Sequence, residues 1–152
     1  MGTTKDKYWY WSLVAPNVKG PGFAWLDPSR LYANREAFRG CVIDLLEPFD
    51  TNEIDLVAGI DAMGFILGSS IANYLDKGFL ALRKKGGLCV DTSDVHYTDY
   101  QNTKKTLEIR TDPFLEGTRV LLVDQWIETG GTMHAAITLV ERMKGIVAGR
   151  KK

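Results

Sequence analysis

The segment RVLLVDQWIETGGTMHAAITLVERM, residues 119–143, carries the strongest structural pattern in the chain. Its apolar run, residues 120–123, is typical of a buried strand, and the run ends on Asp124. A short loop then leads to Thr-Gly-Gly-Thr, residues 129–132, and apolar residues recur at helical spacing from there to Met143. Strand, loop and helix in this order predict one unit of a sheet that is covered by helices.

The loop of this unit suits an anionic ligand. Gly130 and Gly131 let the backbone turn tightly and approach a ligand closely, and the unpaired N–H groups at the start of a helix favour a phosphate. Asp124 follows the strand where its carboxylate could accept hydrogen bonds from sugar hydroxyls. The alternative is an ordinary glycine turn before a helix. The phosphate motifs GxxxxGK(S/T) and GxGxxG do not occur, which disfavours an NTPase or a nicotinamide-dependent enzyme.

Outward from this unit, strands continue to alternate with helices. The strands are apolar runs without strict alternation, which predicts a three-layer α/β fold, a parallel sheet with helices on both faces. Ligands bind outside the carboxyl ends of such strands, where the loops at residues 61–64, 83–87 and 124–132 begin. The predicted strands are residues 54–60, 78–82, 107–109 and 119–124, and a further strand starts at 145–149. One helix is predicted to follow an N-cap at Asn34, and two more span residues 65–76 and 132–143. Residues 89–106 are predicted to form a long exposed loop, with a hairpin only at its base.

Length and charge predict one domain without a nucleic-acid partner. The chain has 152 residues, about the size of one ordinary domain. We expect a single domain over residues 1–152, in which the aromatic, turn-rich residues 1–27 form an arm or hood and residues 28–152 form the core. Lys plus Arg and Asp plus Glu both number 19, so the net charge is zero. This balance argues against binding nucleic acid through bulk charge.

Neither a membrane nor an export signal is indicated. No apolar run approaches the ~20 residues needed to span a bilayer, and the first residues lack the apolar core of a secretory signal. Cys41 and Cys89 form neither a CxxC pair nor a zinc-type cluster. We therefore expect reduced thiols and a cytoplasmic protein.

Four motifs resemble those of the type I phosphoribosyltransferases, and among them of the adenine-specific enzymes. The family's phosphoribosyl-pyrophosphate (PRPP) loop reads roughly VDDLLATGGT, and residues 123–132 read VDQWIETGGT. Residues 57–65, VAGIDAMGF, resemble the pyrophosphate loop AGLDARGF, and residues 83–88, RKKGGL, resemble RKKGKL. Residues 106–109, TLEI, resemble the ELEI that closes the family's flexible catalytic loop. The resemblance extends over nearly the whole chain from Pro21 onward, although the core would lack the family's last strands.

This resemblance implies a transfer reaction of purine salvage. By the resemblance, a purine base, adenine before the others, attacks C1 of PRPP, and pyrophosphate leaves to give AMP. It also implies Mg²⁺ as the cofactor, bound to ligand oxygens and water without direct protein ligands, and a homodimer. The alternative is a relative that has lost turnover and binds a nucleotide in a regulatory role.

The resemblance further implies roles for individual residues. Asp99 would assist protonation at the purine, Tyr100 would close over the site, and Glu128 is a third catalytic candidate. The substrate-binding residues would be Asp124, Gln125, Glu128, Thr129, Gly130, Gly131 and Thr132 in the PRPP loop, Asp61, Ala62, Met63 and Gly64 in the pyrophosphate loop, and Arg83 and Lys84 beside it.

Four positions depart from the family's pattern within the expected cleft. Met63 stands where the family has an Arg that contacts pyrophosphate, and Gly87 stands where a Lys is usual. Gln125 replaces a second acid, and Leu26 replaces an Arg that commonly follows an aromatic residue. Losing two charge-assisted hydrogen bonds would cost about 3–6 kcal/mol without compensation. This loss is the ground for the regulatory alternative.

Glu128 raises a separate hypothesis about the base. In 6-oxopurine phosphoribosyltransferases an Asp often occupies this position and interacts with the purine. A Glu here predicts a base preference shifted away from adenine. The plainer interpretation is a solvated Glu near a helix N-terminus, where the helix dipole favours an acid.

Overall fold

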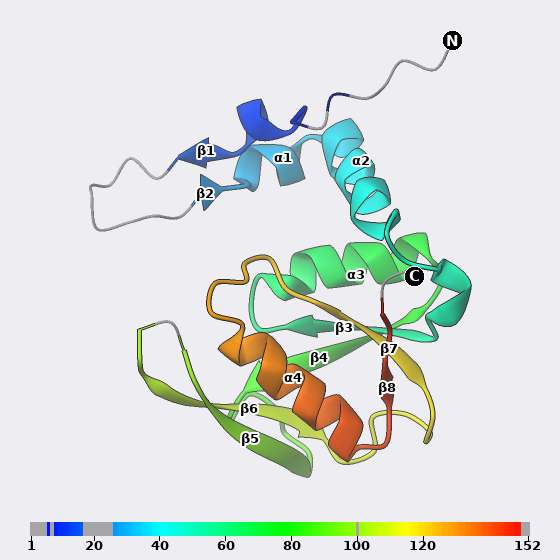
Figure 1. The fold of residues 1–152 in the computed structure, drawn as a ribbon, viewed down its shortest axis with the longest axis vertical. Coiled ribbons are helices and arrows are strands. Elements are labelled where there is room, and N and C mark those ends of the chain that lie inside the picture. The colour runs from blue at the N-terminus through cyan, green and yellow to red at the C-terminus, as the bar shows by residue number, and fades with distance from the viewer. Residues whose placement is uncertain (1–5, 7, 17–25, 100, 150–152) are drawn as a thin grey trace. The chain divides into compact units, whose positions relative to one another are not determined.

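The computed structural model describes residues 6, 8–16, 26–99 and 101–149, and the chain divides into two units, Met1–Glu47 and Pro48–Lys152 (Figure 1). The expected single domain with an arm over residues 1–27 stays a prediction.

The first unit is built around one capped helix. Asn34 caps this helix, because its side-chain oxygen accepts a hydrogen bond from the Ala37 N–H at 3.0 Å, as the sequence predicts. The Trp9 indole N–H donates to Asp44 on the same helix at 2.8 Å, which ties the aromatic segment to it. The elements of this unit are the 3-10 helix η1 (Trp11–Leu13), the antiparallel strands β1 (Ala15–Pro16) and β2 (Leu26–Asp27), and helices α1 (Ser29–Ala33) and α2 (Arg35–Leu46).

The second unit is a six-stranded sheet with two helices. The strand order is β5-β6-β4-β3-β7-β8, and β4, β3, β7 and β8 run parallel. Parallel strands need crossover connections; α3 connects β3 to β4, and α4 connects β7 to the edge strand β8. The elements are η2 (Thr51–Glu53), β3 (Leu56–Ile60), α3 (Gly64–Tyr74), β4 (Gly78–Lys84), β5 (Thr92–Thr98), β6 (Lys104–Arg110), β7 (Arg119–Val123), α4 (Gly131–Arg142) and β8 (Ile146–Val147).

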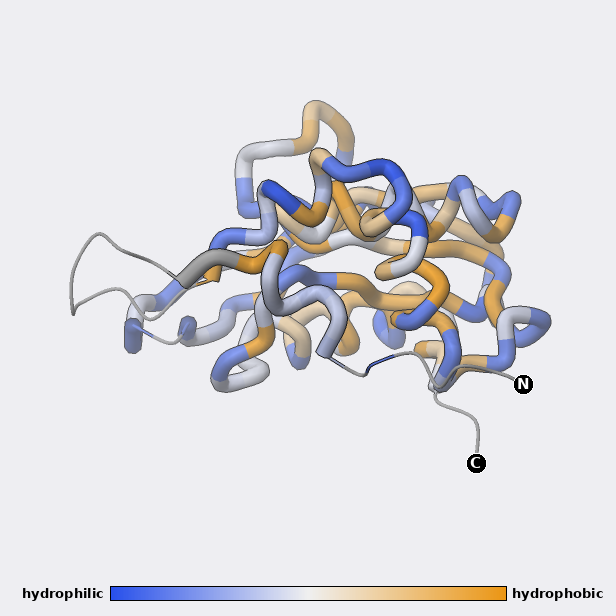
Figure 2. Tube along the Cα trace, turned by 90° about the horizontal axis from the view of Figure 1, so that it is seen from above, coloured by the Kyte–Doolittle hydropathy of each residue, from blue (hydrophilic) through white to orange (hydrophobic). Residues whose placement is uncertain are grey.

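The two helices of this unit cover opposite faces of the sheet. Leu80 of β4 is buried in one cluster with Leu139 of α4. Phe79, the preceding residue of β4, meets Phe65 of α3 edge to face, with ring centroids 5.9 Å apart. Because consecutive strand residues point to opposite faces, α4 and α3 lie on opposite sides, and the predicted three-layer α/β fold is confirmed. The orange stretches of Figure 2 follow the apolar central strands between these layers. Within the described ranges, no helix has the length and apolar character needed to cross a membrane.

The predicted long loop at residues 89–106 is wrong. Strand β5 and the first residues of β6 lie within it. β5 pairs with β6, and β6 pairs in turn with β4; both pairings are antiparallel, so the sheet is mixed rather than wholly parallel. The signal was a period of two, in which Val95 and Tyr97 pack against the core while the residues between them are polar. β5 is an edge strand whose polar residues face solvent, so its composition resembles that of a loop.

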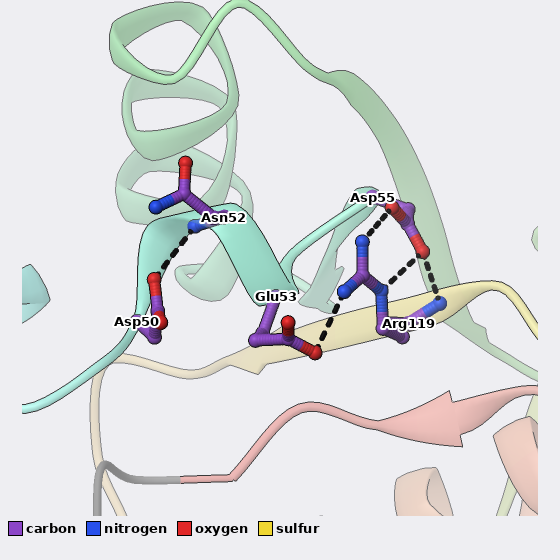
Figure 3. A network of polar contacts seen from close by, with 5 residues as sticks. All are labelled: Asp50, Asn52, Glu53, Asp55 and Arg119. Atoms are coloured by element: carbon purple, nitrogen blue, oxygen red, sulfur yellow. Dashed lines mark hydrogen bonds and ion pairs between the residues drawn. The ribbon is translucent and has the colours of Figure 1, made fainter.

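A clamp joins β3 and β7 at their amino-terminal ends. The Asp55 carboxylate accepts hydrogen bonds from the Arg119 backbone N–H and from Nε and Nη2 of its guanidinium, at 2.7–2.9 Å. Arg119 Nη1 also donates to Glu53 at 2.7 Å (Figure 3). Hydrogen bonds from Arg119 hold the pKa of Asp55 well below its ordinary value. The clamp lies at the edge of the sheet opposite the carboxyl ends, so it stabilises the sheet without contributing to a site there.

Candidate active site

Three loops meet at the carboxyl edge of the central strands. β3 pairs with both β4 and β7 in parallel, so the loops that follow these strands leave the same edge. They span residues 61–63, 85–91 and 124–130. This edge is where parallel α/β sheets bind ligands.

The PRPP loop ends in an open helix N-terminus. Gly130 is the N-cap of α4 and has a left-handed conformation, with φ of +80°. The first intrahelical bond runs from the His134 N–H to the Gly130 carbonyl at 2.8 Å, so the amides of the first turn lack intrahelical partners. The N-cap residue, a glycine, offers no side-chain cap, and the first turn of the helix holds no acid. The arrangement fits a phosphate, as the sequence predicts for residues 129–132.

The hairpin of β5 and β6 lies against this helix start. A Cβ built on Gly131 would overlap the carbonyl oxygen of Thr98, the last residue of β5. The loop can therefore adopt this position only because residue 131 has no side chain. The contact brings the end of β5 to the amino-terminal end of α4.

Asp99 lies next to this contact, but its carboxylate serves the hairpin turn. Its Oδ1 accepts from the N–H groups of Gln101 and Thr103 at 3.0 and 2.9 Å, and its Oδ2 pairs with Lys105 at 2.8 Å. The hydrogen bond from Lys105, and then those from the backbone, lower the pKa of Asp99. The catalytic role of Asp99 stays a prediction, and Tyr100 lies outside the described residues.

Asp124 stands where the PRPP loop meets the pyrophosphate loop. Its Oδ1 accepts from the Gln125 N–H at 2.8 Å, and the Trp126 N–H also acts on the carboxylate. A Cβ built on Gly64 would stand 3.5 Å from this same Oδ1. Burial raises the pKa of Asp124, and the two amides only partly oppose the rise. The half-buried carboxylate has more acceptor lone pairs than these two amides use, so it can accept further hydrogen bonds.

Positive charge is anchored on the pyrophosphate loop. Arg83 Nε donates to Asp61 Oδ2 at 2.9 Å, and the Lys84 backbone N–H reaches the same oxygen at 3.4 Å. The Arg83 guanidinium also lies 6.0 Å from the centre of the Phe65 ring, within the range of a cation–π contact. The structure thus brings Asp61 together with Arg83 and Lys84, as the predicted site requires. The Asp61–Ala62 peptide bond is cis.

The remaining predicted residues differ in exposure. Ala62, Glu128 and Thr129 are exposed, whereas Gln125 and Thr132 are half-buried. Met63 is 45% exposed, and its side chain is uncharged at the position of the pyrophosphate loop where the family has an Arg. Leu26 lies in β2 of the first unit, and Gly87 lies in the loop after β4.

Glu108 was not among the predicted site residues. It lies on β6 and is 3% exposed, between the buried Leu107 and Ile109. An acid inside an apolar strand run is the sequence signal for such a residue. Residues 106–109 entered the sequence analysis only as a motif, so Glu108 was not singled out. Its carboxylate accepts from the Leu88 N–H at 2.8 Å, so it contacts the loop that follows Arg83 and Lys84.

Comparison with known proteins agrees with this geometry. Residues 29–147 match the model of the phosphoribosyl transferase domain. The adenine phosphoribosyltransferase of Dinoroseobacter shibae is 43% identical over 134 residues, which are 88% of this chain and 74% of that protein. That of Brucella suis is also 43% identical, over 84% of this chain and 70% of that protein.

Solved structures extend the match to three dimensions. The crystal structure of adenine phosphoribosyltransferase from Rhodothermus marinus aligns with a TM-score of 0.80 and 40% identity, over 90% of this chain and 77% of that one. The Giardia lamblia enzyme, complexed with 9-deazaadenine, aligns with a TM-score of 0.78 and 32% identity, over 88% and 73%. The resemblance inferred from the motifs is confirmed: this chain belongs to the type I phosphoribosyltransferase family and is similar to its adenine-specific members.

Proposed function

We propose that this chain transfers the phosphoribosyl group of PRPP to adenine, forming AMP and pyrophosphate. One observation carries the proposal. The open N-terminus of α4 and the Arg83–Asp61 pair lie at the same sheet edge, with Asp124 at the contact between their loops. A sugar with a monophosphate at one end and a diphosphate at the other matches an edge with two anion sites and a carboxylate between their loops.

The proposed roles follow from this placement. The amides at residues 130–132 hold the 5′-phosphate, and Asp124 accepts from the ribose hydroxyls. The loop at residues 61–64 and the side chains of Arg83 and Lys84 face the diphosphate and offset its charge as it leaves. Such fixed charges stabilise the transition state because they need no rearrangement during the reaction.

The bond changes define what the site must accomplish. A ring nitrogen of adenine forms a bond to C1 while the bond from C1 to the diphosphate oxygen breaks, and its electron pair leaves with pyrophosphate. The proton of the attacking nitrogen must pass to an acceptor. Asp99 and Glu128 are the candidates that we propose for proton handling at the base.

Mg²⁺ fits this site as a companion of the substrate. In the described part of the chain, no group of three or more His, Cys, Asp or Glu side chains is placed to hold a metal ion. Mg²⁺ binds readily through phosphate oxygens and water with one or two carboxylates, and Asp124 is a carboxylate at the site. When bound with PRPP, the ion would supply charge neutralisation at the leaving diphosphate.

The regulatory alternative is not favoured. It rests on Met63, Gly87, Gln125 and Leu26 alone, and the relatives named above are adenine phosphoribosyltransferases. A cytoplasmic location, a homodimer and a base preference altered by Glu128 remain predictions.

A product assay tests the proposal. The purified chain is incubated with PRPP, Mg²⁺ and, separately, adenine, hypoxanthine and guanine, and nucleoside monophosphates are separated by chromatography. We expect AMP from adenine. Product from a 6-oxopurine in place of adenine would favour the Glu128 hypothesis instead. No product from any base, together with AMP binding by calorimetry, would overturn the transferase activity and favour a nucleotide-binding role.

A further inference from the structure

Glu108 is a charged residue that is buried without a contact ion pair among the described residues, although the Lys85 ammonium interacts with it electrostatically. In the described ranges it is the one charged side chain in the buried class, at 3% exposure. Its cross-strand neighbour in the β4–β6 register is Arg83, but Arg83 Nε donates its hydrogen bond to Asp61 instead. A buried carboxylate is strongly unfavourable unless hydrogen bonds replace its water.

Backbone amides supply those hydrogen bonds. The Leu88 N–H donates to Oε1 at 2.8 Å, and the Thr92 hydroxyl lies 3.5 Å from Oε2. The N–H groups of Gly86 and Gly87 also favour the ionised carboxylate, and the Gly87 N–H donates to the Lys84 carbonyl at 3.1 Å as well. Burial raises the pKa of Glu108, but the three amides and the Thr92 hydroxyl together outweigh it, so the pKa lies below its ordinary value. Consecutive N–H groups that converge on an anion form a nest of the kind that binds phosphate. Here the chain fills the nest with its own carboxylate.

The filled nest fixes the direction of the loop after β4. The loop is attached at its start by the Lys85 N–H, which donates to the Thr106 carbonyl at 3.0 Å. It is attached at its end by the amides on Glu108. Arg83 and Lys84 immediately precede this attached loop, and both contact Asp61 of the pyrophosphate loop.

We infer that Glu108 is a positioning residue of the PRPP site, whose carboxylate occupies the nest of residues 86–88 and so directs Arg83 and Lys84 toward the diphosphate. This role rests on the proposed function. Two consequences follow. The amides of the nest are withheld from PRPP, and the diphosphate must be held by the loop at residues 61–64 and by the cationic side chains. Without the carboxylate, the loop would loosen and PRPP would bind less tightly.

The first test compares Glu108→Gln with Glu116→Gln. The Gln side chain keeps the volume of Glu108 but removes its charge and replaces one of the two acceptor oxygens with an NH2 group, which donates. Glu116 is exposed and pairs with Lys144, so its variant removes the same charge at the surface. Amide hydrogen exchange at residues 86–88 is followed by NMR, and kcat and the KM for PRPP are measured.

For Glu108→Gln we expect exchange at residues 86–88 to accelerate at least about tenfold and the KM for PRPP to rise by at least about tenfold, because each lost bond to a charged group is worth that factor or more. The kcat and the KM for adenine should change little, and Glu116→Gln should behave as the parent. Unchanged exchange would overturn the nest. Faster exchange with a fall in kcat and an unchanged KM for PRPP would overturn the positioning role.

Chemical rescue provides the second test. Glu108→Ala leaves a carboxylate-sized space beside the nest, and added formate should restore slow exchange and the KM for PRPP, whereas chloride at equal ionic strength should not. Equal effects of both salts would overturn the role of the carboxylate. If Glu108→Gln does not fold by circular dichroism, this comparison replaces it. Hydrogen exchange is measured without substrate, so it tests the nest even if the parent chain is inactive. An inactive parent chain would overturn the proposed function alone.

Discussion

Gly64 lies against Asp124 so closely that a Cβ on residue 64 would stand 3.2 Å from the Asp124 Cα and 2.7 Å from the Val123 carbonyl oxygen. Both atoms belong to the backbone, so neither can move aside as a flexible side chain would. The contact joins the loop after β3 to the loop after β7. The distance between the two proposed anion sites therefore depends on this one glycine.

Replacing Gly64 with Ala should push the two loops apart. We expect a loss of about 1–3 kcal/mol in the free energy of unfolding, typical of overpacking, and weaker binding of PRPP than of AMP. Calorimetry with both ligands and urea unfolding would measure these effects. The control is Gly149→Ala, because nothing lies within 4 Å of a Cβ at that position. Equal affinities in Gly64→Ala and the control would contradict the close contact.

Gly131→Ala should separate the hairpin from the start of α4. The new methyl group would overlap the Thr98 carbonyl oxygen, so either β5 or the PRPP loop must shift. We expect AMP affinity to fall at least about tenfold, because the loop geometry that holds a charged group is lost. Calorimetry would report the affinity, again beside Gly149→Ala. Parental AMP affinity in Gly131→Ala would show that the 5′-phosphate does not bind at this helix end.

Asp124→Asn should raise stability while it lowers ligand affinity. Burial raises the pKa of Asp124 in the folded state, so the folded chain holds the proton more readily than the unfolded chain. The stability that this proton contributes is present at low pH and is lost as the pH rises through the folded pKa. At about pH 7 the ionised group therefore destabilises the fold, and Asn removes that cost.

Thermal unfolding at two pH values would test the sign. We expect Asp124→Asn to melt above the parent at about pH 7, with the difference shrinking as the pH falls through the raised folded pKa toward 3.8, the ordinary value of the group. The affinity for PRPP should fall by about tenfold or more, because a charged acceptor for ribose hydroxyls is lost. A variant less stable than the parent at neutral pH would contradict the stated cause of the shift.

The Asp55–Arg119 clamp predicts acid sensitivity of the second unit. Arg119 lowers the pKa of Asp55, so the clamp contributes stability above the unfolded pKa of 3.8 and loses it as the pH falls toward the folded value. Asp55→Asn should lower the melting temperature at about pH 7 and weaken the acid dependence below about pH 4.

Glu53→Gln serves as the comparison for this clamp. Glu53 accepts from one guanidinium nitrogen only, whereas Asp55 also accepts the Arg119 backbone N–H. We expect the Glu53 variant to lose clearly less stability than the Asp55 variant. Transferase activity should change in neither, because the clamp lies at the opposite edge of the sheet. A loss of activity without a loss of stability would contradict this separation.

Met63→Arg should strengthen the binding of PRPP. Met63 is 45% exposed on the pyrophosphate loop, so an Arg has room there and would offer charge-assisted hydrogen bonds worth roughly 1.5–3 kcal/mol. We expect the affinity for PRPP to rise about tenfold and the affinity for AMP, which lacks the diphosphate, to stay as it is. Met63→Gln is the uncharged control. A similar gain in both variants, or no gain in either, would count against a deficit of charge at this loop.

Much of this site could be predicted from local sequence. The apolar run before Asp124 and the Thr-Gly-Gly-Thr that follows predict a strand, a loop and a helix start, and β7 and α4 have those positions. This works because a strand, a helix and its first free amides depend mainly on neighbouring residues. The same reasoning failed for β5, whose polar face made an edge strand resemble a loop.

The amino-acid sequence by itself determined the order of the elements, the glycines of the phosphate loop and the family to which the motifs belong. Only the tertiary structure decided that Gly64 contacts Asp124, that Arg83 pairs with Asp61 across 22 residues, and that Glu108 closes the loop after β4. The physical reason is that these contacts join segments far apart in the sequence. Strand pairing, parallel for β3 with β4 and β7 and antiparallel for β4 with β6, brings them together, and no local pattern encodes it. The carboxylate of Glu108, between two apolar residues in the sequence, is explained only by the fold, which brings backbone amides that donate hydrogen bonds to it.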